Sequence, residues 1–173
     1  PETSQIACFL IKTFLNGSVI GYPLGLFSYI LYYYDMTINI AINGFGRMGR
    51  LALRLGLSSH NIIHINETAG DVKTAAHLLE FDSVHGRWTD EIHIENDTIL
   101  CVNKKEIRWS STEFIQDIPL KEQKIDVVID CTGVHKTVAS LQPYFEQGVK
   151  KVIVSSPIAD KSVLNIVYGI NES

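Results

Sequence analysis

Hydrophobic and polar residues change their period several times between Met36 and Ser173. Residues 38–43 alternate as a strand does, and residues 47–57 carry apolar side chains at helical spacing. Residues 62–65 predict a second strand, and Asp71 caps a predicted helix that runs to Phe81. Strands that alternate with helices in this way indicate parallel βα units.

The middle of the chain follows a different pattern. Ile92 and Ile94 alternate with polar residues, Asn96-Asp97 predicts a turn, and residues 99–102 and 107–109 predict two more short strands. We therefore expect a small antiparallel meander here, inserted into the parallel pattern.

The parallel pattern resumes after the meander. Residues 125–130 predict a buried strand, and a helix is expected from about Lys136 to Gln147 before Gly148. Two further strands are expected at residues 151–155 and 165–168. The predicted fold is α/β: a doubly wound, Rossmann-type parallel sheet with an inserted small antiparallel meander.

Residues 1–35 do not share this pattern. Residues 13–34 carry no charge, a length that fits a membrane helix, but Pro23 and several glycines disfavour one. The alternatives are translated upstream sequence before a native start at Met36, or a signal segment, for which no convincing cleavage site is visible. We expect residues 1–35 to be an extension, and residues 36–173 to form the main domain.

Composition narrows the function classes. The chain of 173 residues has a formal net charge of −4 and no basic run, which disfavours nucleic-acid binding. Its three cysteines lack metal-ligand spacing and cannot all pair, so a reduced, cytoplasmic setting is expected and no metal site is predicted. Membrane attachment is the less favoured alternative.

A glycine motif stands between the first strand and its helix. Gly44, Gly46 and Gly49 form Gly-x-Gly-x-x-Gly in the strand-to-helix setting of dinucleotide-binding turns. Gly44 would permit the tight turn, Gly46 the approach of a pyrophosphate, and Gly49 close packing of helix on strand. An ordinary glycine-rich turn is the alternative.

Other predicted strand ends carry suitable groups, and the ends of parallel strands share one crevice. Glu67 follows Gly49 by 18 residues, near the spacing at which a carboxylate binds the adenosine ribose and disfavours a 2′-phosphate. Thr132-Gly133 and Ser155 offer bare backbone and hydroxyls. Taken singly, these could be a solvated glutamate and plain turns; together they favour an NAD site.

Two tempting residues fit structural roles better. His85 is expected to structure its loop, although a catalytic role is the alternative. Cys131 follows a strand end, but no activating base or cation is evident nearby, so a small buried thiol is predicted.

Several motifs together resemble the phosphorylating glyceraldehyde-3-phosphate dehydrogenases, in the family's order from Met36 to Ser173. They are residues 42–50, 79–87, 131–134, 151–157 and 167–171. The resemblance implies an NAD-binding domain in which Arg47-Met48 lie against the pyrophosphate, Glu67 binds the ribose, and Ser155 lies near the nicotinamide. The predicted cofactor-binding residues are Gly44, Phe45, Gly46, Arg47, Met48, Gly49, Glu67, Thr132, Gly133 and Ser155.

The chain also departs from the family pattern. The family usually has aspartate at Glu67, and an arginine is replaced near Glu113-Phe114, which affects the adenine side. Residues 66–70 and 141–148 resemble a branch found beside arsenate-resistance transporters, so phosphate and arsenate both stay open as acyl acceptors.

The family's nucleophilic cysteine, base histidine and substrate contacts lie beyond the sequence matched here. The resemblance therefore implies the NAD-binding half of an aldehyde dehydrogenase whose catalytic domain is missing from this chain, with no catalytic residue among its 173. A stand-alone NAD-binding module or an inactive relative is the alternative. The relatives are homotetramers, but assembly of this part alone is doubtful.

Overall fold

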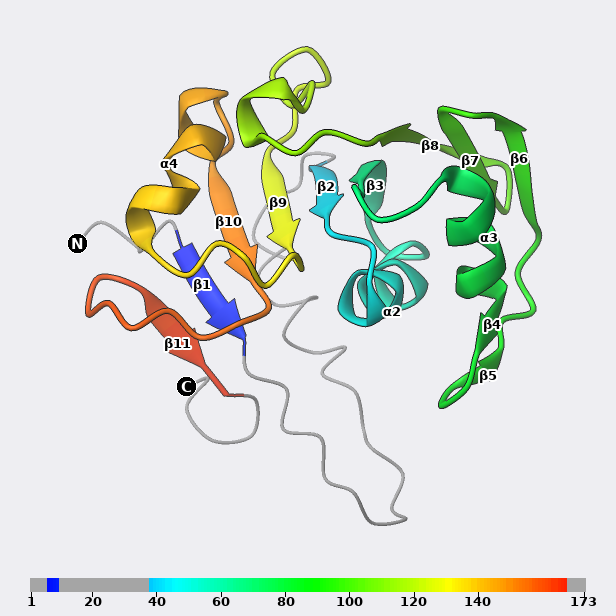
Figure 1. Cartoon of the computed structure of the whole chain (residues 1–173), viewed down its shortest axis with the longest axis horizontal. Coiled ribbons are helices and arrows are strands. Elements are labelled where there is room, and N and C mark those ends of the chain that lie inside the picture. The colour runs from blue at the N-terminus through cyan, green and yellow to red at the C-terminus, as the bar shows by residue number, and fades with distance from the viewer. Residues whose placement is uncertain (1–5, 10–37, 168–173) are drawn as a thin grey trace.

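The structure, a computed structural model, describes residues 6–9 and 38–167 of the chain. One nine-stranded sheet dominates, in the order β11-β1-β10-β9-β2-β3-β8-β7-β6 (Figure 1). Its strands are β1 Ile6–Phe9, β2 Asn39–Asn43, β3 Asn61–Asn66, β6 Ile92–Asn96, β7 Ile99–Val102, β8 Lys105–Ser110, β9 Val127–Asp130, β10 Lys151–Val154 and β11 Leu164–Ile166.

The strands from β11 to β8 run parallel, and only β7 and β6 continue the sheet in antiparallel pairs. The described helices are α2 Arg47–Gly56, α3 Val72–Glu80 and α4 Val138–Glu146, with a 3-10 turn at Ile115–Asp117. The predicted doubly wound α/β fold is confirmed.

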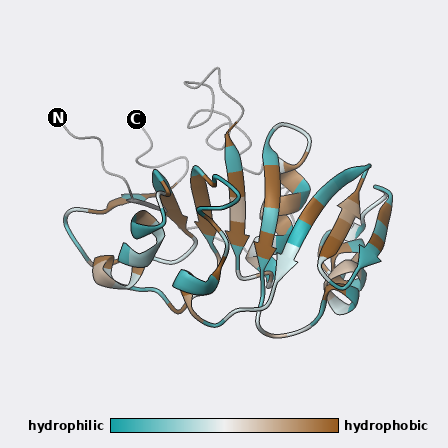
Figure 2. Cartoon of the chain, turned by 90° about the horizontal axis from the view of Figure 1, so that it is seen from above, coloured by the Kyte–Doolittle hydropathy of each residue, from teal (hydrophilic) through white to brown (hydrophobic). Residues whose placement is uncertain are grey.

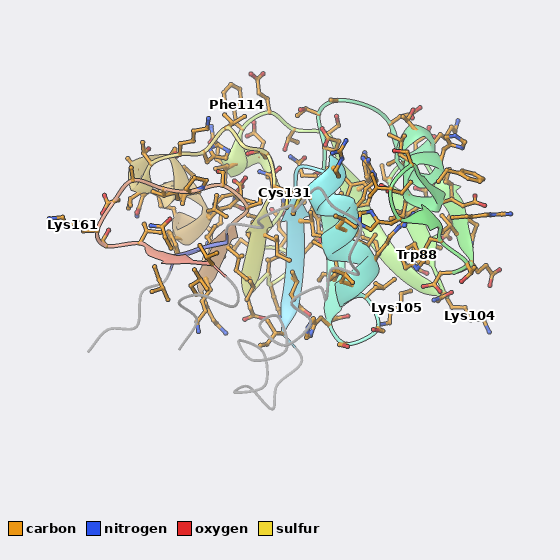
Figure 3. The ribbon with its side chains drawn as sticks, turned by 90° about the horizontal axis from the view of Figure 1, so that it is seen from below. Trp88, Lys104, Lys105, Phe114, Cys131 and Lys161 are labelled. Carbon is orange, nitrogen blue, oxygen red and sulfur yellow. The ribbon has the colours of Figure 1, made fainter. Side chains whose placement is uncertain are left out.

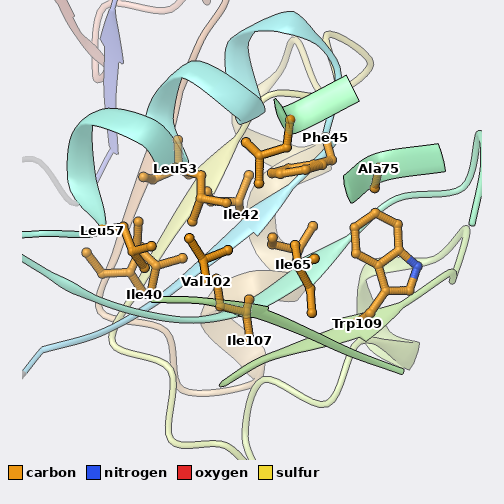
Figure 4. Packing of buried hydrophobic residues seen from close by; sticks show 14 of the residues in the cluster. Ile40, Ile42, Phe45, Leu53, Leu57, Ile65, Ala75, Val102, Ile107 and Trp109 are labelled. Carbon is orange, nitrogen blue, oxygen red and sulfur yellow. The ribbon is translucent and has the colours of Figure 1, made fainter. Parts of the chain in front are cut away.

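Alternation along each strand divides the core between the two faces of the sheet. Ile40 and Ile42 point to the face covered by α2 and α3, where Phe45 and Trp109 also pack (Figure 4). Ala41 points to the opposite face, under α4. The hydropathy colouring shows hydrophobic runs along several strands of the sheet (Figure 2). Burial on both faces explains why these strands read as continuous apolar runs.

Helix ends follow local side-chain chemistry. Asp71 accepts a hydrogen bond from the Thr74 amide at 2.7 Å, so it caps α3 as predicted. Helix α4 begins two residues later than Lys136, because Thr137 and Ser140 form a capping box there.

The structure adds contacts that the pattern did not predict. The meander β6-β7-β8 is present, but β8 also pairs in parallel with β3, so the meander extends the main sheet. A two-stranded hairpin, β4 Phe81–Asp82 with β5 Gly86–Arg87, follows α3. Of the last predicted strand, Tyr168 lies outside the described residues.

Residues 6–9 of the predicted extension belong to the sheet. β1 pairs in parallel with β10 on one side and with β11 on the other. The candidate membrane segment 13–34 lies outside the described residues, and none of the described helices has the length and apolar character needed to cross a membrane.

Candidate functional site: a crevice at the strand ends

The turn after β2 packs directly on the turn after β9. Gly44 has φ +89°, and a Cβ added there would lie 2.7 Å from the backbone of Cys131 and Thr132. The Gly44 amide donates to the Asn66 carbonyl at 2.8 Å. Three strand ends that are distant in sequence, those of β2, β3 and β9, are therefore in contact, as the crevice prediction requires.

The three motif glycines differ in what surrounds them. A Cβ at Gly49 would lie 2.1 Å from the Gly44 carbonyl oxygen, so only glycine lets α2 pack this close to the turn. At Gly46 nothing lies within 4 Å of an added Cβ. Gly46 is also the N-cap of α2 and supplies no side-chain cap. The first turn of α2 therefore faces open space with amide groups oriented toward it, which suits a phosphate.

The residues beside these glycines have different exposures. Arg47 is exposed and Met48 is half-buried in the first turn of α2. The Phe45 ring is buried and meets Trp109 edge-to-face, with ring centroids 5.8 Å apart (Figure 4). The Phe45 side chain therefore belongs to the core, and its backbone amide and carbonyl are hydrogen-bonded to Glu67 and Arg50.

Glu67 ties the end of β3 to the glycine turn. Its Oε2 accepts the Phe45 amide at 2.6 Å, and its Oε1 accepts the Ala69 amide at 2.7 Å. A carboxylate has about four lone-pair positions, so each oxygen keeps one for a further donor. The half-buried carboxylate is thus held in place and can still accept hydrogen bonds from a sugar diol.

The Thr132-Gly133 turn is organised by the carboxylate that precedes it. Thr132 donates its amide at 3.0 Å and its hydroxyl at 2.7 Å to Asp130 Oδ1, and the Val134 amide donates to the same hydroxyl oxygen. Gly133 has φ +69° and nothing near an added Cβ. Thr132 therefore shapes the turn, while Gly133 presents exposed backbone.

Ser155 lies one strand further along the same edge. Its amide donates to the Asp130 carbonyl at 2.9 Å, and its side chain is half-buried. The structure thus brings together all four strand ends that carry the predicted site residues.

The two weaker candidates behave as the sequence suggested. Burial, with the Asp130 charge adding to it, raises the pKa of the Cys131 thiol to about 12, so the thiol stays protonated at neutral pH. The residue is half-buried, less enclosed than the predicted buried thiol. The His85 amide donates to Asp82 Oδ1 at 2.8 Å and lowers the pKa of that carboxyl to about 2, a loop-structuring arrangement.

Sequence reasoning missed a buried polar cluster beneath the crevice. Asn43, Asn66, Asp130 and Tyr144 are almost fully buried and joined by hydrogen bonds. The signal that could have revealed this cluster is position, because Asn43, Asn66 and Asp130 are each the last residue of an apolar strand. Phe114, beside the family departure, projects into solvent and is 57% exposed (Figure 3).

The description "Glyceraldehyde 3-phosphate dehydrogenase, NAD binding domain" fits residues 38–138 in a comparison with protein families. The chain belongs to this family. The family's domain binds NAD, and the match begins at the residue before β2.

Curated relatives agree with this assignment. "Glyceraldehyde-3-phosphate dehydrogenase 3" of Nostoc sp. is 45% identical over 139 residues, which make up 79% of this chain and 41% of that protein. Glyceraldehyde-3-phosphate dehydrogenase of Xanthobacter flavus is 39% identical over 140 residues, with the same two shares. The chain therefore spans about two fifths of the length of these relatives.

Proposed function

We propose that the crevice at the ends of β3, β2, β9 and β10 holds NAD with its pyrophosphate at Gly46. The observation that carries the proposal is the contrast among the glycines. Gly44 and Gly49 are required by protein packing, whereas Gly46 has open space in front of uncapped helix amides. Packing against the described residues therefore does not require glycine at position 46, whereas the close approach of a phosphate to the backbone would.

The remaining groups assign an orientation to the dinucleotide. Glu67 would accept the adenosine ribose hydroxyls with the lone pairs that Phe45 and Ala69 leave free. The exposed backbone of Gly133 would lie along the dinucleotide, and Ser155 would lie toward the nicotinamide. Bound NAD supplies a hydride acceptor; the residues of this chain bind and orient it.

Glu67 makes cofactor selectivity the sharpest test of this orientation. Its charge would repel a 2′-phosphate, so the chain should bind NAD more tightly than NADP. Glu67→Gln removes the charge and should narrow that preference by about tenfold, because one unit charge at close range is worth roughly 1 kcal/mol or more. Glu80→Gln, on the distant end of α3, is the matched control and should leave the preference unchanged.

Equilibrium titration with each dinucleotide measures this preference. Equal affinities for NAD and NADP in the unchanged chain, or a preference that Glu67→Gln does not alter, would remove Glu67 from the ribose site.

In a complete protein of this family, we place this domain in an NAD-dependent phosphorylating aldehyde dehydrogenase. The support is the family match and the identity to named glyceraldehyde-3-phosphate dehydrogenases. The expected activity is oxidation of an aldehyde phosphate, and a cytoplasmic location fits the free thiols of Cys101 and Cys131.

A stand-alone NAD-binding module is the second candidate. It is favoured by one feature: the hydrogen bonds that fix the glycine turn, Glu67 and the Thr132 turn are all made within this chain. Addition of a relative's second domain separates the two candidates. Aldehyde oxidation after that addition supports the dehydrogenase, whereas NAD binding without aldehyde oxidation supports the stand-alone module.

A further inference from the structure

The crevice rests on a layer of polar residues that end their strands. Asn43 is the last residue of β2, Asn66 of β3 and Asp130 of β9, and the next residues along the chain form the cofactor turns. All three are at most 6% exposed. Polar groups buried this deeply are costly unless they are hydrogen-bonded, so their partners define their positions closely.

Tyr144 of α4 also belongs to this layer. Tyr144 is fully buried. Its hydroxyl donates to Asp130 Oδ2 at 2.8 Å and accepts a hydrogen bond from the side-chain amide (Nδ2) of Asn43 at 2.6 Å. Asn66 in turn donates to Asn43 Oδ1 at 2.8 Å. One hydroxyl therefore connects the ends of β9 and β2 directly and the end of β3 through Asn43.

The other oxygen of Asp130 reaches the cofactor turn. Asp130 Oδ1 accepts both the amide and the hydroxyl of Thr132. Thr132 in turn lies against Gly44, with no room for a Cβ between them. His135 completes the surroundings of the carboxylate, with Nε2 3.9 Å from Asp130 Oδ2 and its ring 6.2 Å from that of Tyr144.

We propose that Tyr144 and Asp130 are positioning residues for the NAD site, holding the Gly44 and Thr132-Gly133 turns at the spacing that the dinucleotide requires. This inference rests on the proposed placement of NAD at these turns. Neither side chain needs to touch the cofactor: Tyr144 fixes Asp130, and Asp130 fixes the Thr132 turn.

The test uses the full chain with Tyr144→Phe, which removes only the hydroxyl. The matched control is Leu141→Ala, because Leu141 is equally buried on the same helix and packs in the same hydrophobic cluster as Tyr144 but has no hydrogen-bonding group in its side chain. NAD affinity and hydrogen exchange of the Gly44, Cys131 and Thr132 amides are measured for both variants.

Tyr144→Phe should weaken NAD binding by at least about tenfold, because it leaves two buried hydrogen bonds unmade, those with Asp130 and Asn43. It should also accelerate hydrogen exchange at the three turn amides relative to the unchanged chain, and by more than at the amides of β6 and β7. Leu141→Ala should lower stability through its cavity while leaving NAD affinity within about twofold of the unchanged chain.

Equal NAD affinity in Tyr144→Phe and the unchanged chain would overturn the inference, as would equal losses in Tyr144→Phe and Leu141→Ala. If the unchanged chain binds no NAD, the proposed cofactor site fails by itself. Exchange at the three turn amides then decides the positioning role: selective acceleration in Tyr144→Phe supports it, and unchanged exchange overturns it.

Discussion

At the residue scale, the three motif glycines carry separate tasks that substitution can separate. Gly49 lies against the Gly44 carbonyl, whereas Gly46 borders open space. The same change, glycine to alanine, should therefore act on folding at one position and on ligand binding at the other.

Gly49→Ala should destabilise the fold by about 3 kcal/mol or more, because its methyl group would overlap a backbone oxygen that cannot rotate away. Denaturant unfolding of the purified chain measures the change. A variant that unfolds at the same denaturant concentration as the unchanged chain would show that the helix does not pack against the turn this closely.

Gly46→Ala should cost about 1 kcal/mol of stability or less, because the φ of −67° suits alanine and its methyl group meets nothing within 4 Å. The methyl group would occupy the space in which we propose the pyrophosphate lies, so NAD affinity should fall by at least about tenfold. Unaltered NAD binding in this variant would place the phosphates elsewhere.

His64 gives the fold a pH dependence of known sign. The residue is 1% exposed, with Nε2 2.8 Å from Ser110 Oγ and Nδ1 2.9 Å from the side-chain amide nitrogen (Nε2) of Gln123. Burial lowers its pKa from 6.5 to about 4. Between these values the unfolded chain binds the proton and the folded chain does not, so stability contributed by neutral His64 is complete above 6.5 and lost as the pH falls toward 4.

Because of His64 alone, the unfolding free energy should fall by about 2 kcal/mol from about pH 7 to about pH 5, at about 1.36 kcal/mol per pKa unit. Urea unfolding at the two pH values measures the loss. His64→Gln should reduce the difference, whereas His93→Gln, exposed on β6, should not. An unchanged pH dependence in His64→Gln would assign it to other groups.

At the element scale, β1 is the least expected part of the sheet. Among the described strands, β11 pairs only with β1, so Ile6–Phe9 links Leu164–Ile166 to the rest of the sheet. A four-residue strand separated from its partners by most of the chain leaves no local signal, because its pairing is decided by distant residues.

Ala7→Pro should disrupt this link, since proline removes a backbone donor and fits poorly within a strand that has neighbours on both sides. We expect faster hydrogen exchange in β10 and β11 and unchanged exchange at β6–β7 across the sheet. Equal exchange rates at β10 and β11 in the variant and in the unchanged chain would mean that β1 contributes nothing to the sheet's stability.

At the scale of the whole molecule, the sequence predicted the layered architecture because each strand and helix carries its own period. Ile40, Ala41 and Ile42 already encode the two buried faces of β2. The hairpin at Phe81–Arg87 and the pairing of β8 with β3 were missed, because short strands and sheet order depend on contacts distant in sequence.

The site divides in the same way. Gly44, Gly46 and Gly49 could be proposed from a contiguous motif, and Glu67 from its distance of 18 residues after Gly49. The layer of Asn43, Asn66, Asp130 and Tyr144 could not, because its members look like ordinary polar strand ends until folding joins them.

The placement of NAD at the strand-end crevice is the central claim, and amide chemical-shift mapping of the full chain during an NAD titration tests it most directly. We predict saturable shifts concentrated at Gly44–Met48, Glu67, Thr132–Gly133 and Ser155, with the amides of β6 and β7 unaffected. Shifts centred away from these residues, or none at saturating NAD while the chain remains folded, would contradict the account.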